Sequence, residues 1–260
     1  MKIDVWTHIL SPAYIRQIEA AGHRGPGVDA FLLANRALSD LDRRFEVMDR
    51  YGDYRQVLTP IPGPPGYHGP VSQDLIDLVR RNNEEMAEIV GRHPDRFAGF
   101  AAATPLADPD AAIAEATRAV RELGALGVQL EADARTFPLH EDRYDPLFAA
   151  MEEAGAGVWL HPCRPPATPG VAPAAAPFLL WQVFGWVVDT TITVSRLIFA
   201  GLYDRHPRLT LIAHHGGGLI PHFSGRVAMM PDFAGMDATL GEALARLPQP
   251  PLAYFKMLYV

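Results

Sequence analysis

The 260-residue sequence has little cysteine, no long apolar run and no excess of positive charge, and each shortage excludes a class of protein. Its single cysteine, Cys163, cannot form an internal disulfide, which excludes a disulfide-stabilised miniprotein and fits a reducing cytoplasm. No apolar run approaches the roughly 20 residues that span a bilayer, so we predict no membrane partner. The opening MKIDVWTHIL lacks the apolar core and cleavage site of a secretory signal. Acidic residues outnumber basic ones by 30 to 23 without a basic stripe, so a nucleic-acid partner is not expected.

Short apolar runs alternate with longer helical patterns along the whole chain. Runs that are apolar nearly throughout and rich in β-branched and aromatic residues are typical of parallel strands buried on both faces. The seven runs are Lys2–Trp6, Tyr54–Thr59, Phe97–Ala102, Gly127–Leu130, Gly157–Leu160, Leu209–Ala213 and Tyr254–Val260. Repeated strand–helix units predict an α/β protein with a parallel sheet or barrel, and the length suits one barrel domain over residues 1–260.

Four segments between the apolar runs carry helical patterns. Asp108–Gly124 is the clearest, because Asp108 suits the cap, Pro109 suits the first turn, and a glycine ends the pattern. The other three are Asp74–His93, Asp145–Glu153 and Thr191–Tyr203. Gly22–Asp49 and Pro165–Pro177 contain glycine and proline at a density that predicts loops beside the site; an interdomain linker is the alternative for the second.

Histidines stand at the ends of three predicted strands: His8, His161 and the pair His214–His215. The carboxyl ends of barrel strands converge on one mouth, where imidazoles bind divalent metals or move protons near pH 7. A packing or hydrogen-bonding role is the alternative for any one of them. The glycines Gly216–Gly218 after the pair predict either a close approach to a ligand or left-handed backbone before the next helix.

Other candidate residues are less distinctive. Arg226 suits a carboxylate partner, although its position alone favours an exposed helix arginine. Trp6 and Trp181 suit a flat or unsaturated substrate and equally suit a core. Cys163 is interpreted as a small buried hydrophobic residue.

Several longer segments carry a family resemblance. They are MKIDVWTHIL, PDRFAGFAAATPL, ELGALGVQL, WLHP, DTTITVSRLIFAGLYDRHPRLTLIAHHGGGLIPHFSGRV and MPDFAG. On these segments the sequence resembles the amidohydrolase-2 family, in the branch of aminocarboxymuconate-semialdehyde decarboxylase and related aromatic-acid decarboxylases. The resemblance covers nearly the whole chain and implies a (β/α)₈ barrel of the amidohydrolase superfamily.

The resemblance implies roles for individual residues. His8 and His161 match ligands of a divalent metal, commonly zinc, and His215 matches the catalytic histidine. Arg226 matches an arginine that reaches the substrate carboxylate of an adjacent subunit, which implies a homodimer.

Two departures from the family pattern concern the metal. Trp6 stands where the first histidine of a His-x-His pair is expected, and the indole nitrogen cannot bind zinc. The Gly-Thr/Ser-Asp-Tyr-Pro motif that supplies an aspartate ligand after the eighth strand is not found before Val260. Two ligands are fewer than the three that a catalytic zinc keeps, which argues against tight zinc binding by this chain alone. We therefore expect a C-terminally incomplete barrel without its eighth strand and last helices.

The favoured function is non-oxidative decarboxylation of a small aromatic or unsaturated carboxylic acid, with Arg226 orienting the acid and a proton donor near His215. Two alternatives stay open. The same fold and histidines would serve a hydrolase or hydratase acting on a lactone or unsaturated dicarboxylate. A non-catalytic homologue with a degraded metal site is the other.

Overall fold

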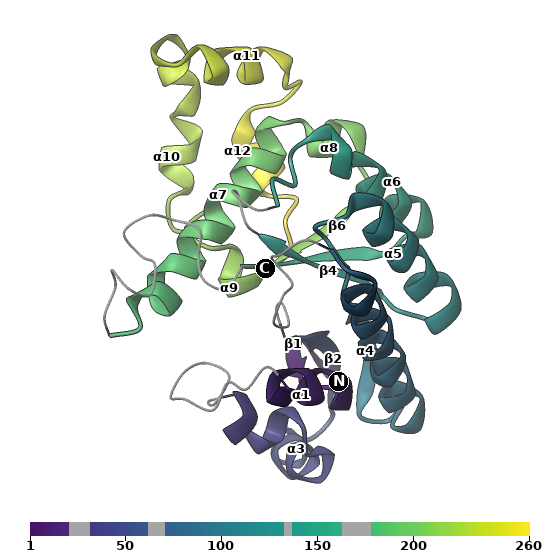
Figure 1. Ribbon diagram of the computed structural model, residues 1–260. Coiled ribbons are helices and arrows are strands. Elements are labelled where there is room, and N and C mark those ends of the chain that lie inside the picture. Colours follow the sequence, from purple (N-terminus) through teal and green to yellow (C-terminus); the bar gives the residue numbers. More distant parts are fainter. Residues whose placement is uncertain (21–31, 62–70, 133–136, 163–177) are drawn as a thin grey trace. The chain divides into compact units, whose positions relative to one another are not determined.

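A computed structural model describes residues 1–20, 32–61, 71–132, 137–162 and 178–260, which form two compact units (Figure 1). Unit 1 is Met1–Gln129 and unit 2 is Leu130–Val260, and each is described by itself. Cys163, the predicted loop Pro165–Pro177 and the first part of Gly22–Asp49 lie outside the described residues. The single domain over residues 1–260 stays a prediction.

Unit 1 is a parallel sheet with helices packed on it. Its elements are β1 (Lys2–Ile9), α1 (Pro12–Ala20), η1 (Arg36–Leu38), α3 (Leu41–Met48), η2 (Asp49–Tyr51), β2 (Tyr54–Pro60), α4 (Gln73–Arg92), β3 (Phe97–Ala102), α5 (Pro109–Leu123) and β4 (Gly127–Ala132). Neighbouring strands are parallel from β1 to β4, and β4 continues into unit 2. Four of the apolar runs therefore form the strands that the sequence predicts, each with the same or slightly wider bounds.

Helix α5 forms for the local reasons that its sequence gives. The Asp108 side chain accepts hydrogen bonds from the backbone N–H groups of Asp110 and Ala111, at 3.0 and 3.1 Å. Pro109 occupies the first turn, and Gly124 ends the helix in the left-handed region with φ 71°. Its buried alanines lie against the unit's core. The predicted segment Asp108–Gly124 is confirmed with both caps.

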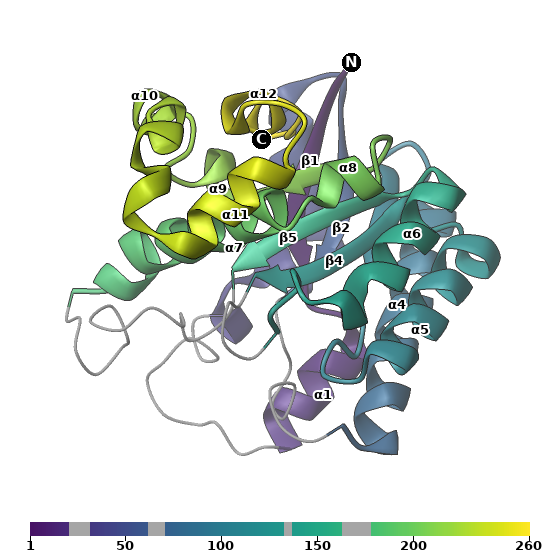
Figure 2. The same cartoon turned by 90° about the horizontal axis from the view of Figure 1, so that it is seen from above.

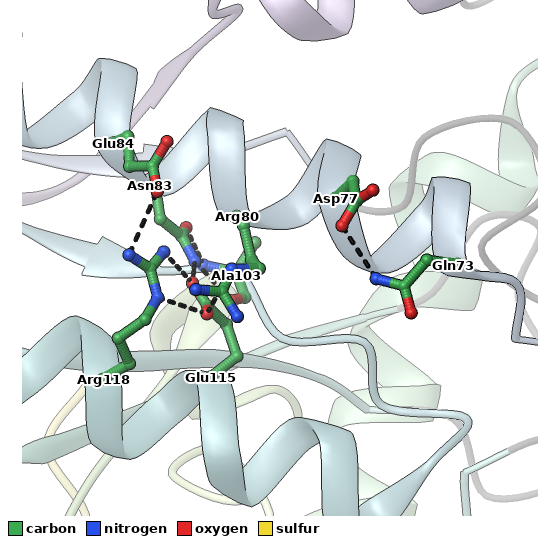
Figure 3. Close-up of polar contacts among 8 residues, drawn as sticks. All are labelled: Gln73, Asp77, Arg80, Asn83, Glu84, Ala103, Glu115 and Arg118. Carbon is green, nitrogen blue, oxygen red and sulfur yellow. Dashed lines mark hydrogen bonds and ion pairs between the residues drawn. The ribbon is translucent and has the colours of Figure 1, made fainter.

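A polar network joins α4 and α5 to the end of β3 (Figure 3). The Asn83 amide accepts from the Ala103 N–H at 2.8 Å and donates to the Ala103 carbonyl at 2.9 Å and to Glu115 at 2.8 Å. Glu115 is 3% exposed and receives two hydrogen bonds from the Arg118 guanidinium, at 2.7 and 2.8 Å. Two helices and one strand end are thus fixed by side chains that are almost fully buried.

The prediction of a loop over Gly22–Asp49 is wrong for Leu41–Met48, which form α3. Asp40 caps this helix by accepting a hydrogen bond from the Arg43 N–H at 3.1 Å. Arg44 is buried and donates to the backbone carbonyls of Ala37 and His8. The buried face of α3 therefore consists of Arg44 and Met48, and the charged composition of the segment conceals it.

Unit 2 begins with the end of β4 and continues with more helices than strands. Its elements are η3 (Asp142–Tyr144), α6 (Asp145–Ala154), β5 (Gly157–Pro162), η4 (Trp181–Gly185), α7 (Trp186–Phe199), α8 (Leu202–Arg205), β6 (Thr210–Ala213), α9 (His214–Gly217), α10 (Ser224–Ala228), η5 (Met230–Met236), α11 (Ala238–Arg246) and α12 (Pro251–Phe255). β5 and β6 pair in parallel, with Leu160 opposite Ala213 at their carboxyl ends. Both α6 and α7 pack on β5 (Figure 2).

Two predictions for unit 2 need correction. The helix expected over Thr191–Tyr203 is two helices, α7 and α8, because Gly201 between them has φ 79°. The run Tyr254–Val260 was expected to be a strand, but its first residues belong to α12, which Pro251 starts. Only Tyr259 of this run pairs among the described residues: its backbone joins β6 through hydrogen bonds of 2.8 and 3.0 Å to Ala213 and Leu211.

The predicted α/β class with a parallel sheet is confirmed. The six described strands neighbour one another in chain order, β1-β2-β3-β4-β5-β6. Closure into an eight-stranded barrel and the absence of the eighth strand stay predictions. Among the helices that the structure describes, none has the length and apolarity needed to cross a bilayer.

Candidate functional site

Three histidines meet at the carboxyl end of the β5–β6 pair in unit 2. His161 is the fifth residue of β5, and His214 and His215 follow directly after β6. The ring of His161 stacks on that of His214 with centroids 4.4 Å apart, and the rings of His214 and His215 are 4.0 Å apart. Parallel pairing of the two strands therefore brings together residues that are more than fifty positions apart in sequence.

The backbone after β6 turns through the left-handed region for four residues. His215 has φ 52° and ψ 41°, and Gly216, Gly217 and Gly218 have φ of 62°, 76° and 69°. A residue other than glycine in this region costs about 1 kcal/mol or more of conformational energy, and such strained residues are common at functional sites. The glycine run thus has the left-handed backbone expected of it, and the strain falls on His215.

Gly218 holds this turn against α7. A Cβ at Gly218 would lie 2.5 Å from Oγ1 of Thr191 and 2.8 Å from the carbonyl oxygen of Val187. The Thr191 hydroxyl donates to that carbonyl at 2.7 Å and accepts from the Leu219 N–H at 2.8 Å. The turn that carries His215 is therefore bonded to the helix without room for a side chain.

Two tryptophans extend the histidine group. The ring of Trp186 stacks on His215 with centroids 5.6 Å apart and 14° between planes, and it meets His161 edge-on at 6.1 Å. Trp181, a predicted substrate residue, packs edge-on against Trp186 at 5.3 Å and is 7% exposed. Trp186 was missed in the sequence, where its recurrence five residues after Trp181 was the one available signal.

Burial sets the protonation of His215, and a backbone contact sets the tautomer of His161. Burial lowers the pKa of His215 to about 4, so its imidazole is neutral at pH 7. Its Nδ1 is buried and has no hydrogen-bond partner among the described residues. His161 is 2% exposed, and its Nδ1 lies 2.7 Å from the carbonyl oxygen of Pro162. Because a carbonyl only accepts, this contact puts the hydrogen on Nδ1 and the lone pair on Nε2.

His8 and Trp6 lie on β1 in unit 1. The Nδ1 atom of His8 is 2.9 Å from Oγ1 of Thr59 and 3.1 Å from the carbonyl oxygen of Pro60, both on β2. Trp6 is half-buried, and its backbone N–H donates to Oδ1 of Asp4 at 3.0 Å. Its indole nitrogen is a donor only and cannot bind a metal. In unit 1 the predicted metal ligand is therefore a histidine oriented by two oxygen atoms.

Arg226 lies on α10 and lines a cavity of about 480 Å³ in unit 2. The walls come from α7, α10, η5 and the segment before α10, and the described lining includes no histidine. Phe223 and Phe233 line the same cavity. The residue itself is exposed, as its position in the sequence predicted.

Comparisons with known proteins agree with this arrangement. The amidohydrolase family model Amidohydro_2 matches residues 3–256. A gamma-resorcylate decarboxylase from Rhizobium radiobacter is 34% identical over 202 residues, covering 75% of this chain and 61% of the relative. A 2-amino-3-carboxymuconate-6-semialdehyde decarboxylase from Dictyostelium discoideum is 28% identical over 242 residues, covering 87% and 66%. The chain spans about three fifths of the length of the first of these relatives.

Solved structures resemble the chain over most of its length. A 2,6-dihydroxybenzoate decarboxylase complexed with 2,6-dihydroxybenzoate is 27% identical with a TM-score of 0.72, covering 95% of this chain and 74% of the other. A dihydroxybenzoic acid decarboxylase from Polaromonas sp. JS666, with bound manganese and 2-nitroresorcinol, shares the fold at 23% identity and a TM-score of 0.77, covering 99% and 76%. With the family model matched across residues 3–256, the chain belongs to the amidohydrolase family.

Proposed function

We propose that this protein removes carbon dioxide, without an oxidant, from a small aromatic or unsaturated carboxylic acid. The observation that carries the proposal is the neutral His215 imidazole stacked on Trp186 beside His161 and His214. A flat ring beside imidazoles suits a planar acid. The relatives support the same class, since both are named decarboxylases of unsaturated or aromatic acids.

The proposed reaction adds one proton and breaks one carbon–carbon bond. The carbon that bears the carboxylate takes up the proton, the bond to the carboxylate breaks, its electron pair returns to the unsaturated system, and CO₂ leaves. His215 is the proposed catalytic residue. With a pKa of about 4 it is neutral at pH 7, so it relays a proton and does not retain it.

The histidines fit a divalent metal. His161 and His214 are stacked neighbours, and the contact of His161 with Pro162 places its lone pair on Nε2, the form that ligates metals. We propose His8 and His161 as ligands, with His214 as a third. A bound divalent cation would supply positive charge to the oxygen atoms of the substrate. Zinc and manganese are the two ions to test.

Three further assignments belong to the proposal. Trp181 and Trp6 are proposed to contact the substrate. The edge-on packing of Trp181 against Trp186, which stacks on His215, supports this role for Trp181. Arg226 is proposed to bind the carboxylate in the adjacent subunit of a homodimer, and its exposure on α10 supports that role. The cytoplasm is the proposed location.

The test is release of labelled CO₂ from 2,6-dihydroxybenzoate carrying ¹³C in its carboxylate, followed by mass spectrometry. We expect wild-type release and a loss of roughly 100-fold or more in His215→Asn, the size typical of a lost acid–base group. His222→Asn is the matched control, because His222 is exposed on the segment that follows the same turn. Release unchanged by His215→Asn would overturn the role of His215. Lactone hydrolysis or hydration without CO₂ would favour the alternative reaction, and no turnover of any acid would favour a binding protein.

A further inference from the structure

The carbonyl oxygen of Pro60, at the end of β2, is contacted by side chains from two other strands of unit 1. Nδ1 of His8 on β1 lies 3.1 Å from this oxygen, and Nε2 of Gln129 on β4 donates to it at 3.2 Å. β4 is two strands away from β2, so the Gln129 side chain reaches past the neighbouring strand. One backbone oxygen therefore links the predicted metal ligand to a residue 121 positions further along the chain.

These contacts select one tautomer of His8. The Pro60 carbonyl can only accept, so a contact of 3.1 Å is favourable with a hydrogen on Nδ1. The Thr59 hydroxyl, 2.9 Å from the same nitrogen, then acts as a second acceptor. With the hydrogen on Nδ1, the lone pair is on Nε2. Donation to a backbone carbonyl is how proteins fix the ring of a histidine that ligates a metal.

The buried position of Gln129 lowers the stability of the fold. Its side chain is 4% exposed, and its Oε1 is buried without a hydrogen-bond partner in the described part of the chain. An unpaired buried acceptor destabilises the fold, and a leucine of similar size would avoid that loss. A leucine could not donate the hydrogen bond that Nε2 of Gln129 makes to the Pro60 carbonyl oxygen. This is the same oxygen that His8 contacts.

The main chain of His8 is held as well. Arg44 on α3 donates from its guanidinium to the His8 carbonyl oxygen, and to Gln56 at 2.9 Å. Arg44 is 6% exposed, and burial lowers its pKa to about 10, which leaves it charged at pH 7. Arg44 thus fixes the backbone from one side, and Thr59 and Pro60 contact Nδ1 of the His8 ring.

We propose that Gln129 is a positioning residue for His8, acting through the Pro60 carbonyl oxygen. Gln129 holds this oxygen in the direction that favours the Nδ1–H tautomer, and Thr59 supplies the second acceptor. The consequence for metal binding rests on the function proposed above. The prediction about the tautomer does not rest on that function, because the tautomer is a property of the chain without metal.

The first experiment measures the tautomer directly. The full chain is labelled with ¹⁵N-histidine, freed of metal by chelation, and studied by NMR at pH 8, where an ordinary histidine is neutral. His8→Ala assigns the signals of His8. We expect Nδ1 of wild-type His8 to carry the hydrogen and Nε2 to have the shift of an unprotonated nitrogen. In Gln129→Leu the two nitrogen shifts should move toward each other, as the tautomers mix.

Variants of Thr59 distinguish a specific effect on the His8 tautomer from a general loss of stability. Thr59→Val keeps the shape and removes the acceptor, so it should mix the tautomers, whereas Thr59→Ser keeps the hydroxyl and should restore the wild-type shifts. Gln73→Leu is the control for glutamine replacement, because Gln73 is exposed on α4, where its side chain donates to Asp77. Wild-type His8 shifts in Gln129→Leu would overturn the proposal, even if that variant is less stable.

A second measurement follows Mn²⁺ affinity by calorimetry. We expect Gln129→Leu to bind Mn²⁺ about tenfold more weakly than wild type, which is the low end for loss of an outer hydrogen-bonding partner. Equal affinity in both would overturn the positioning role toward the metal. If the wild type binds no Mn²⁺ while the tautomer shifts in Gln129→Leu, the metal site fails and the positioning of His8 stands.

Discussion

Two adjacent asparagines on α4 should respond to the same substitution with opposite signs. Asn82 and Asn83 are both fully buried, with 0% of each side chain exposed. Asn83 makes three hydrogen bonds, two to Ala103 and one to Glu115 (Figure 3). Neither polar atom of the Asn82 amide has a hydrogen-bond partner in the described residues. We predict that Asn83→Leu destabilises the protein and that Asn82→Leu stabilises it.

The magnitudes follow from what each leucine leaves behind. Asn83→Leu leaves the N–H and carbonyl of Ala103 buried and unpaired, and at roughly 1–2 kcal/mol for each group the loss is about 3 kcal/mol. Asn82→Leu removes a buried amide that has no partner, which should raise the free energy of unfolding by about 1–2 kcal/mol. Both substitutions gain the same helix propensity, so the difference between them isolates the hydrogen bonds.

The assay is urea unfolding of the full chain followed by circular dichroism, with hydrogen exchange of the segment 97–106 as a local readout. We expect faster exchange in Asn83→Leu, because Ala103 lies in this segment, and unchanged or slower exchange in Asn82→Leu. Gln73→Ala is the control, since the Gln73–Asp77 pair lies on the exposed side of α4 and should change stability by less than about 0.5 kcal/mol. If both leucine variants shift stability in the same direction, the reasoning from hydrogen bonds is refuted.

Three other predictions concern the glycine turn, Asp145 and the proposed metal. Gly218→Ala should destabilise the protein by about 3 kcal/mol or more in thermal unfolding, because its Cβ would lie 2.5 Å from Oγ1 of Thr191. The Cβ in Gly216→Ala would meet nothing within 4 Å, so this variant should lose only about 1 kcal/mol, for its left-handed backbone. Equal losses in the two variants would contradict this reasoning. Burial alone would raise the pKa of Asp145, but hydrogen bonds from His206 and Arg205 hold it below the ordinary value. The ionised carboxylate therefore stabilises the fold above about pH 4, and this stabilisation is lost as pH falls through the lowered pKa; Asp145→Asn should flatten the stability profile in that range, and an unchanged profile would count against the assignment. Removal of divalent metal by a chelator should abolish CO₂ release if the proposed metal site is correct, with Mn²⁺ restoring it.

Local signals carried most of what could be predicted about the fold. Helix α5 was predicted with its caps because Asp108, Pro109 and Gly124 act within one turn of their own position. Helix α3 was missed because the glycines and the proline that indicated a loop lie earlier in the segment, and its buried face includes the charged residue Arg44. The run Tyr254–Val260 was apolar enough for a strand, but apolar content does not separate a short buried helix from a strand.

The candidate site was predictable where it depends on strand ends and not where it depends on packing. His161, His214 and His215 follow or end strands, so their meeting follows from parallel pairing. Trp186 contacts His215 because α7 packs against the turn after β6, a tertiary contact between positions 29 residues apart. Gln129 appeared only as one polar residue in an apolar run, and its bond to Pro60 depends on which strands lie within reach.

The hydroxyl of Thr191 has a consequence for how the histidine turn moves. It bonds the carbonyl of Val187 inside α7 and the N–H of Leu219 beyond the glycines, so the helix and the turn share one hydrogen-bonding group. Releasing the turn breaks the bond from the Leu219 N–H to this hydroxyl, and the close packing of Gly218 against Thr191 and Val187 leaves no space for partial displacement. The turn should therefore open in one step, when Leu219 leaves Thr191, and His215 should change its surroundings in that step and not by gradual drift.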